Sequence, residues 1–312
     1  MVSYLARRVA LSLVVLCGLL VATFVIVHLV PGDPVAQVLG SRATPEAIAA
    51  ARHQVGLDQP LLQQFFSFAG GVLHGDFGHS IPLDAPVSQV IGPRLLPSAL
   101  LITYGLALAL LIGVPLAVFA AVRPNRGADN AIRFATTFAF AMPTFWLGLM
   151  LALLLGLKLG WFPVSGYERS VTGFFRTLTL PALTIGLSLA VVVVRTLRSN
   201  LLEVLRSEYV EAARSRGLSE VRVVGKHAMR NAVTATITIL SVNVGFLIGG
   251  TVVIEAVFQI PGAGSLLVQA VQRRDYELIQ VLALLAGAAV VLVGLFADLL
   301  QSVLDPRVRL RR

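Results

Sequence analysis

The sequence predicts an all-α polytopic membrane protein with six transmembrane helices and both termini on the cytoplasmic side. Only 13% of its 312 residues are charged and its mean hydropathy is +0.84, whereas soluble globular domains carry about 25% charged residues. In addition, six uncharged apolar stretches approach or exceed the roughly 20 residues that a membrane-spanning helix needs. They are Val9–Val30, Leu95–Val122, Phe134–Leu157, Leu178–Val194, Asn231–Ile254 and Leu278–Ala297.

The first of these stretches is interpreted as a retained membrane helix rather than a signal peptide. Its apolar run is longer than the usual 7–15 residues, and no small-x-small cleavage site follows it. Cys17 lies in this run and is the only cysteine in the chain, so no intramolecular disulfide is possible. We expect Cys17 to be a buried apolar filler.

The distribution of basic residues predicts the orientation. Seventeen of the 25 Lys and Arg residues fall on the side of the six spans that also holds both termini. Basic residues concentrate in cytoplasmic loops, so this side is predicted to be cytoplasmic in a multi-pass protein of the cell membrane. A nucleic-acid-binding function would need a basic patch with stacking aromatics on a soluble domain, and the sequence has none.

The spans divide the chain into four parts. These are an N-terminal transmembrane helix (1–30), an extracytoplasmic insert (31–94), a five-helix core (95–305) with a cytoplasmic elbow (206–226), and a basic tail (306–312). Within the insert, Thr44 and Pro45 are typical of a helix start and Gly56 of a helix end. A second helix is predicted over Leu61–Leu73.

Several kinds of chemistry are missing from the sequence. There is no phosphate-binding loop, no HExxH zinc motif and no GxSxG nucleophile elbow, so the chain is predicted to be no enzyme and to bind neither ATP nor a metal. His74 and His79 in a Gly-rich turn have no third ligand beside them and are interpreted as solvated loop histidines. The central parts of the spans hold no charged residue, which argues against a self-sufficient secondary transporter.

The segment between the fourth and fifth spans is unlike its surroundings. Residues 208–232 hold three acidic residues, five Lys or Arg residues and one His. Ser207 is predicted to cap a short helix with Glu208 and Glu211 in its first turn. Gly217 is predicted to end it in a left-handed conformation, with Leu218 as the hydrophobic contact of a Schellman ending, and Ser219 to cap the next helix.

This helix–Gly–helix elbow has the properties of a docking surface. Ala212 and Ala213 are small enough for close approach, and Arg214, Arg216 and Arg222 offer charge-assisted contacts. Composition and capping are also compatible with a solvated connecting loop.

The sequence of this elbow, "EYVEAARSRGL", resembles the EAA–Gly motif of ABC importer membrane subunits. Together with "LVPGDP", "GDFGHSI", "PTFWLGL", "LGWFPVSGY", "LPALTIGL", "HAMRNA", "VFQIPGAGSLL", "RRDYELIQ" and "LDPRVR", it makes nearly the whole chain similar to the B-type permease of dipeptide and oligopeptide importers of the peptide/nickel family. The resemblance implies the type I ABC importer permease fold. The chain departs from the family at Ala235, where a proline is frequent.

The resemblance also implies partners and a role for the elbow. The expected partners are a second, C-type permease, two ATP-binding subunits or domains that hold ATP and Mg, an extracytoplasmic peptide-binding protein, and membrane lipid, with no nucleic acid. The elbow is expected to dock in a cleft of the ATPase. Its candidate docking residues are Glu208, Tyr209, Glu211, Ala212, Ala213, Arg214, Arg216, Gly217 and Leu218.

The translocation path is less defined by sequence. Thr234, Thr238, Ser241 and Gly245 share one face of the fifth span and are candidate pore-lining residues, although close helix packing through small residues accounts for the same pattern. Glu255 near the outer end of this span is a candidate outer gate or docking residue. The alternative is an interfacial carboxylate with a polar partner.

The function that follows is a permease subunit of an ATP-driven peptide importer. A nickel or metal-chelate importer remains an alternative within the family, although Cys17 and His28 are the only thiol and imidazole groups in the six runs. A secondary transporter and a membrane scaffold without transport activity are alternatives of other classes.

Overall fold

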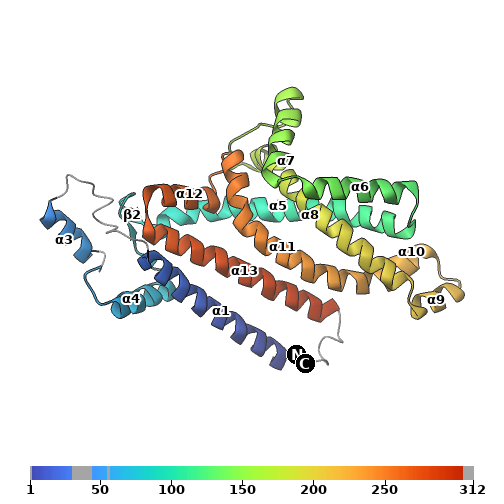
Figure 1. The fold of residues 1–312 in the computed structure, drawn as a ribbon, viewed down its shortest axis with the longest axis horizontal. Helices are drawn as coiled ribbons and strands as arrows, with labels where there is room; N and C mark the ends of the chain where they lie inside the picture. Colours follow the sequence, from blue (N-terminus) through green and yellow to red (C-terminus); the bar gives the residue numbers. More distant parts are fainter. Residues whose placement is uncertain (1, 30–43, 55–56, 305–312) are drawn as a thin grey trace.

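A computed structural model describes residues 2–29, 44–54 and 57–304, and these residues are mostly helical (Figure 1). The helices are α1 (Val2–Leu29), α3 (Pro45–Gln54), α4 (Leu61–His74), α5 (Val87–Val122), α6 (Gly127–Ala141), α7 (Thr144–Leu151), α8 (Val171–Leu205), α9 (Glu208–Ser215), α10 (Glu220–Arg222), α11 (Met229–Val257), α12 (Ala263–Arg273) and α13 (Tyr276–Leu304). Two π-helical segments, Ala152–Lys158 and Val223–Ala228, follow α7 and α10, and β1 (His79–Ser80) pairs antiparallel with β2 (Ala85–Pro86).

Five of the predicted spans correspond to unbroken helices that are long and apolar enough to cross a membrane. Three of them are α1, α5 and α8, the fourth runs through α10 and α11 over Glu220–Val257, and the fifth is α13. Several helices extend beyond the apolar runs. For example, α5 begins at Val87, inside the segment assigned to the insert. Its first turns are more polar than the apolar run but belong to the same helix.

The third predicted span is not one straight helix. It consists of α6 followed by Thr144–Lys158, and the two parts are bent by 105° relative to each other. The break lies at Met142, whose backbone is extended (φ −84°, ψ 131°), directly before Pro143. Proline has no N–H to donate and disfavours a helical conformation in the residue before it, which favours a break at this position. Prolines also lie inside α5 and α8, which remain unbroken, so Pro143 alone does not determine the bend.

The core of the bundle is the contact between α5 and α8. A Cβ atom on Gly105 would lie 2.5 Å from the Ile185 side chain, and one on Gly113 would lie 2.9 Å from Val193. The two glycines are eight residues apart, as are their partners, so the helices approach closely over several turns. Small residues permit such close approach of membrane helices.

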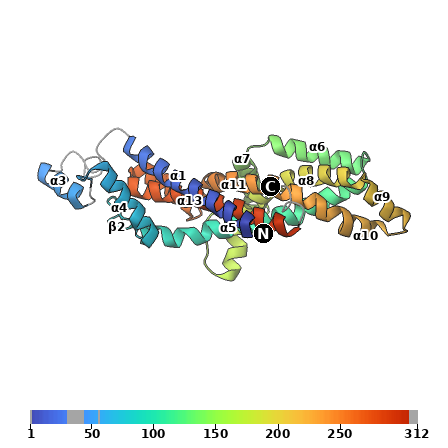
Figure 2. The ribbon, with the colours of Figure 1, turned by 90° about the horizontal axis from the view of Figure 1, so that it is seen from below.

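The two ends of the molecule differ in character. Figures 1 and 2 show α3, α4, the β1–β2 hairpin and α12 at one end, and α9 and α10 at the other. The helix start at Pro45 and the helix from Leu61 are confirmed, whereas Gly56 lies outside the described residues. Phe68 of α4 packs on a buried cluster at the outer ends of the core helices. The members of this cluster are Val87, Ile91, Leu266, Ala270, Leu278, Val281 and Leu282.

The first helix lies against the last. Arg8 of α1 forms an ion pair with Asp298 of α13, and Phe24 near the other end of α1 contacts Phe65 of α4, with ring centroids 5.4 Å apart. The expectation that Cys17 is buried is wrong, because its side chain is exposed. Much of the surface of α1 away from α13 is uncovered, and Cys17 lies on it.

Candidate functional site

The turn at the centre of the elbow has the geometry that its sequence predicts. Gly217 is left-handed, with φ 79°. Its N–H donates to the Arg214 carbonyl at 2.8 Å, and the Leu218 N–H donates to the Ala213 carbonyl at 3.4 Å. These two bonds form a Schellman ending, which satisfies carbonyl groups that the end of α9 would leave without partners.

The predicted serine caps are correct in position but not in hydrogen bonding. Ser207 and Ser219 are the N-cap residues of α9 and α10, yet neither side chain accepts a hydrogen bond from the following turn. The Ser207 hydroxyl instead donates to the Val204 carbonyl at 2.5 Å, at the end of α8. It therefore stabilises the end of the preceding helix rather than the start of α9.

A small cluster of apolar side chains forms the interior of the elbow. Val210, Ala213 and Val223 are buried, and Leu218 packs against them. Ala213 therefore faces the interior of the elbow, while Ala212 is exposed. Both alanines were proposed to allow close approach of a partner protein, but only the Ala212 side chain is accessible to such a partner.

Arg214 is engaged within the elbow. Its Nε donates to a Glu220 carboxylate oxygen at 2.8 Å, one Nη donates to the other oxygen at 3.3 Å, and the second Nη donates to the Leu205 carbonyl at 3.3 Å. Hydrogen bonding to Glu220 raises the pKa of Arg214 above its ordinary value. This residue connects α9 to the end of α8 and the start of α10.

Tyr209 connects the elbow to the fifth span. Its hydroxyl accepts a hydrogen bond from the Asn231 amide at 2.7 Å and donates to the His227 carbonyl at 3.4 Å. The remaining predicted docking residues are exposed, apart from the half-buried Leu218. The exposed residues are Glu208, Glu211, Ala212, Arg216 and Gly217.

Val221 is a further exposed residue that sequence reasoning missed. Its side chain is 85% exposed at the surface of α10. The sequence does contain a signal for this residue, which is an apolar valine within a charged segment. The prediction of helix caps did not use it, because it considered only Ser219 and the residues before it. With Arg222 beside it, Val221 gives this side of the elbow both apolar and basic character.

The predicted pore-lining residues lie on α11, and two of them meet α13. The Thr238 hydroxyl accepts a hydrogen bond from the Gln301 amide at 2.7 Å, and a Cβ atom on Gly245 would lie 3.2 Å from Val290. The hydroxyls of Thr234 and Ser241 donate to carbonyls of their own helix. The face therefore makes both polar and close-packed contacts with a neighbouring helix of the same chain.

Glu255 is fully buried at the junction of three helices. Its carboxylate accepts hydrogen bonds from the Ser98 hydroxyl of α5 at 2.5 Å and from the Ser265 N–H of α12 at 2.7 Å. A Cβ atom on Gly262 would clash with this carboxylate, so the chain passes it at a distance that only glycine allows. Glu255 thus caps the start of α12 from another helix.

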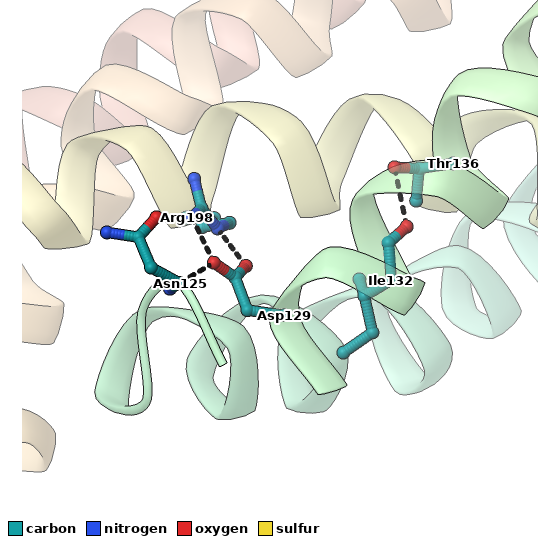
Figure 3. Close-up of polar contacts among 5 residues, drawn as sticks. All are labelled: Asn125, Asp129, Ile132, Thr136 and Arg198. Carbon is teal, nitrogen blue, oxygen red and sulfur yellow. Dashed lines mark hydrogen bonds and ion pairs between the residues drawn. The ribbon is translucent and has the colours of Figure 1, made fainter. Parts of the chain in front are cut away.

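A buried ion pair at the opposite end was not predicted. Arg198 of α8 donates two hydrogen bonds of 2.6 Å to the Asp129 carboxylate of α6, and the Asn125 N–H donates a third at 2.9 Å (Figure 3). The Asp129 side chain is inaccessible to solvent. Sequence reasoning treated Arg198 only as a cytoplasmic cation, because its partner is 69 residues away.

The residues in the described segments do not suggest a metal centre. No group of three or more His, Cys, Asp or Glu side chains in residues 2–29, 44–54 and 57–304 is arranged to hold an ion. A ring nitrogen of His74 lies 2.8 Å from the Gly70 carbonyl, and one of His79 lies 3.2 Å from the Asp84 carboxylate. Ala235, at the position where proline is frequent, is exposed within an uninterrupted α11.

Comparison with known proteins places most of the chain in one group. Residues 113–310 match the family described as the binding-protein-dependent transport system inner membrane component, and residues 1–88 match the N-terminal part of such membrane components. The glutathione transport system permease protein GsiC of Salmonella typhi is 38% identical over 309 residues. The oligopeptide transport system permease protein AppB of Bacillus subtilis is 36% identical over 314 residues. Each match covers 99% of both chains.

A solved structure supports the fold. The MetNI methionine ABC transporter, in inward facing conformations, matches with a TM-score of 0.58 over 70% of this chain and 97% of that chain. The sequences are 17% identical, so this likeness concerns the fold alone.

Proposed function

The chain belongs to the family of inner membrane components of binding-protein-dependent transport systems, and from this membership we propose that it is the permease subunit of an ATP-driven importer of dipeptides and oligopeptides. It is a multi-pass membrane protein and a transport component rather than an enzyme. The substrate class is supported by the relatives named for oligopeptide and for glutathione, which is itself a tripeptide. Neither name supports the metal-chelate alternative.

The observation that carries this function is the construction of the elbow. α9 is exposed and charged on its outer side, and a helical path runs from α10 without interruption into α11. The Arg214–Glu220 pair and the Tyr209–Asn231 hydrogen bond join α9 to the span that runs through α10 and α11, and the hydrogen bond from Arg214 to the Leu205 carbonyl joins it to α8. A force applied to α9 by a bound ATPase would therefore move α8 and α11 together, which is the coupling that a pore without its own motor needs.

A permease of this kind works with ATPase and permease partners. We propose the specific set of a C-type permease, two ATP-binding subunits or domains carrying ATP and Mg, and an extracytoplasmic peptide-binding protein. Glu208, Glu211, Ala212, Arg216 and Val221 form the proposed surface toward the ATPase. Ala213, Arg214 and Leu218 hold its shape through contacts within the elbow.

The proposed path follows the polar face of α11. Thr234, Thr238 and Ser241 supply hydroxyl groups along it, whereas Gly245 serves the packing of α11 on α13. For Glu255 we propose an indirect role at the outer gate, through its hold on α12, because its carboxylate is too deeply buried to meet a binding protein.

Reconstitution tests the function. The chain, its second permease and the ATPases are placed in proteoliposomes with ATP on the ATPase side and the binding protein with a labelled dipeptide on the other. We expect peptide uptake that requires every component. Uptake by this chain alone would support a secondary transporter, and uptake of nickel without peptide would support the metal-chelate alternative.

A further inference from the structure

The short connection from α5 to α6 concentrates positive charge at the cytoplasmic end of the bundle. Arg123, Arg126 and Arg133 are exposed within eleven residues that contain a single acidic residue, Asp129. Within the part of the chain that the structure describes, neither Arg126 nor Arg133 forms an ion pair or a side-chain hydrogen bond. Uncompensated guanidinium groups of this kind are sites for anions.

Asp129 forms no ion pair with these arginines, although it lies within about one turn of both. Its two carboxylate oxygens are occupied by Arg198 and by the Asn125 N–H, and its side chain is inaccessible to solvent (Figure 3). The acidic group turns inward to α8, while the arginines on either side of it remain outside. The charge of this surface is therefore built into the packing of α6.

The same helix exposes an apolar face beside the arginines. Arg126 is the residue directly before α6 and has an extended backbone, and Arg133 lies in the second turn of the helix, so both are near the start of α6. Phe134 and Phe138 lie on the adjoining face, are 75% and 60% exposed, and stack with centroids 6.5 Å apart. Ile132 and Thr136, on the opposite side, lie toward the bundle (Figure 3).

We propose that this face of α6, defined by Arg126, Arg133, Phe134 and Phe138, binds an anionic phospholipid of the cytoplasmic leaflet. The guanidinium groups bind the phosphate, for which their planar donors are suited. The two phenylalanine rings contact the acyl chains. Basic residues at the cytoplasmic membrane surface and an adjacent apolar helix face are the combination that holds anionic lipids.

Binding of a fluorescent phosphatidylglycerol to the full-length chain, purified with its second permease in a neutral detergent, tests the proposal. A phosphatidylcholine with the same chains and label is the reference lipid. We expect phosphatidylglycerol to bind at least about tenfold more tightly. Arg126→Gln/Arg133→Gln should remove this preference, and Arg126→Lys/Arg133→Lys should keep most of it.

Two further variants test whether the lipid preference belongs to this face of α6. Arg169→Gln/Arg176→Gln removes the same charge from exposed positions outside α6, just before α8 and in its second turn, and should leave the preference intact. Phe134→Ala/Phe138→Ala should weaken binding of both lipids. Equal affinity for the two lipids in the unaltered chain would overturn the proposal. So would displacement of the phospholipid by inorganic phosphate alone, or an Arg126→Gln/Arg133→Gln variant that binds lipid normally but loses its ATPase.

Discussion

The Ser98 hydroxyl of α5 donates a 2.5 Å hydrogen bond to the Glu255 carboxylate of α11, and both side chains are buried. The same hydroxyl oxygen accepts a hydrogen bond from the Ala263 N–H, at 2.8 Å. One serine therefore connects α5, α11 and the first turn of α12. These buried polar contacts hold α12 across the outer end of the bundle.

Removing this hydroxyl should destabilise the outer end. In Ser98→Ala, the buried Glu255 carboxylate and the partly buried Ala263 N–H each lose a partner, at a cost on the order of 1–3 kcal/mol. We expect a lower midpoint in thermal unfolding of the purified permease pair. Ser188→Ala is a matched control, because the Ser188 hydroxyl donates only to the Thr184 carbonyl of its own helix. If both variants unfold at the temperature of the unaltered protein, Ser98 does not hold this junction.

The ion pair between Asp129 and Arg198 should be more costly to break. Asp129→Asn leaves the partly buried Arg198 guanidinium without its charge partner, and breaking a pair of this kind costs up to about 3–5 kcal/mol. Asp129→Leu/Arg198→Met should recover much of the loss, because it removes both charges and keeps side-chain volume. The measurement is again the unfolding midpoint, and a double variant no more stable than Asp129→Asn would contradict this role of the pair.

The extent to which sequence predicts this protein follows the range of each interaction. The left-handed Gly217 and the Leu218 contact were predictable because a helix ending is determined by a few adjacent residues. The partners of Glu255 and Asp129 were not, since they are 157 and 69 residues away. Pro143 was a local signal for the bend in the third span, but the prediction relied on the continuous apolar character of Phe134–Leu157 and treated the run as one helix.

The role of Arg214 could not be predicted from sequence either, because its partner Glu220 lies across a turn that brings the two side chains together only in the folded chain.

Exposed pairs contribute about 0.2–1 kcal/mol to stability, so Arg214→Gln should leave assembly intact. It should instead loosen α9 and reduce peptide transported per ATP hydrolysed. Arg214→Glu/Glu220→Arg should restore part of the coupling, whereas Arg216→Gln should leave the internal geometry unchanged. A transport-to-ATPase ratio in Arg214→Gln equal to that of the unaltered complex would contradict this role.

Charge reversal at the outer side of α9 should act on docking rather than on folding. Glu211→Lys places a cation in the first turn of α9, where it is disfavoured by about 0.3–1 kcal/mol, and it reverses the charge presented to the ATPase. We expect normal membrane levels and normal pairing with the second permease, but weaker ATPase association in co-purification. Glu168→Lys, at an exposed position before α8 and outside the elbow, is the control. Normal ATPase association and uptake in Glu211→Lys would favour the solvated-loop interpretation of the elbow.

The final prediction compares two glycines of the cytoplasmic segment. Gly217 has φ 79°, whereas Gly225 lies in the π-helical segment Val223–Ala228 and is not left-handed, and a Cβ atom would meet no other atom within 4 Å at either position. Backbone conformation is therefore the only difference that an alanine would detect. Gly217→Ala should cost about 1 kcal/mol and Gly217→Val more, because a left-handed residue with a Cβ is strained. Gly225→Ala should be neutral or slightly stabilising, since alanine favours a helix. Both proteins should reach the membrane, and uptake assays should show a loss only at Gly217. If Gly217→Val transports peptide at the rate of Gly225→Ala in a fully assembled complex, the angle of the elbow has no part in coupling.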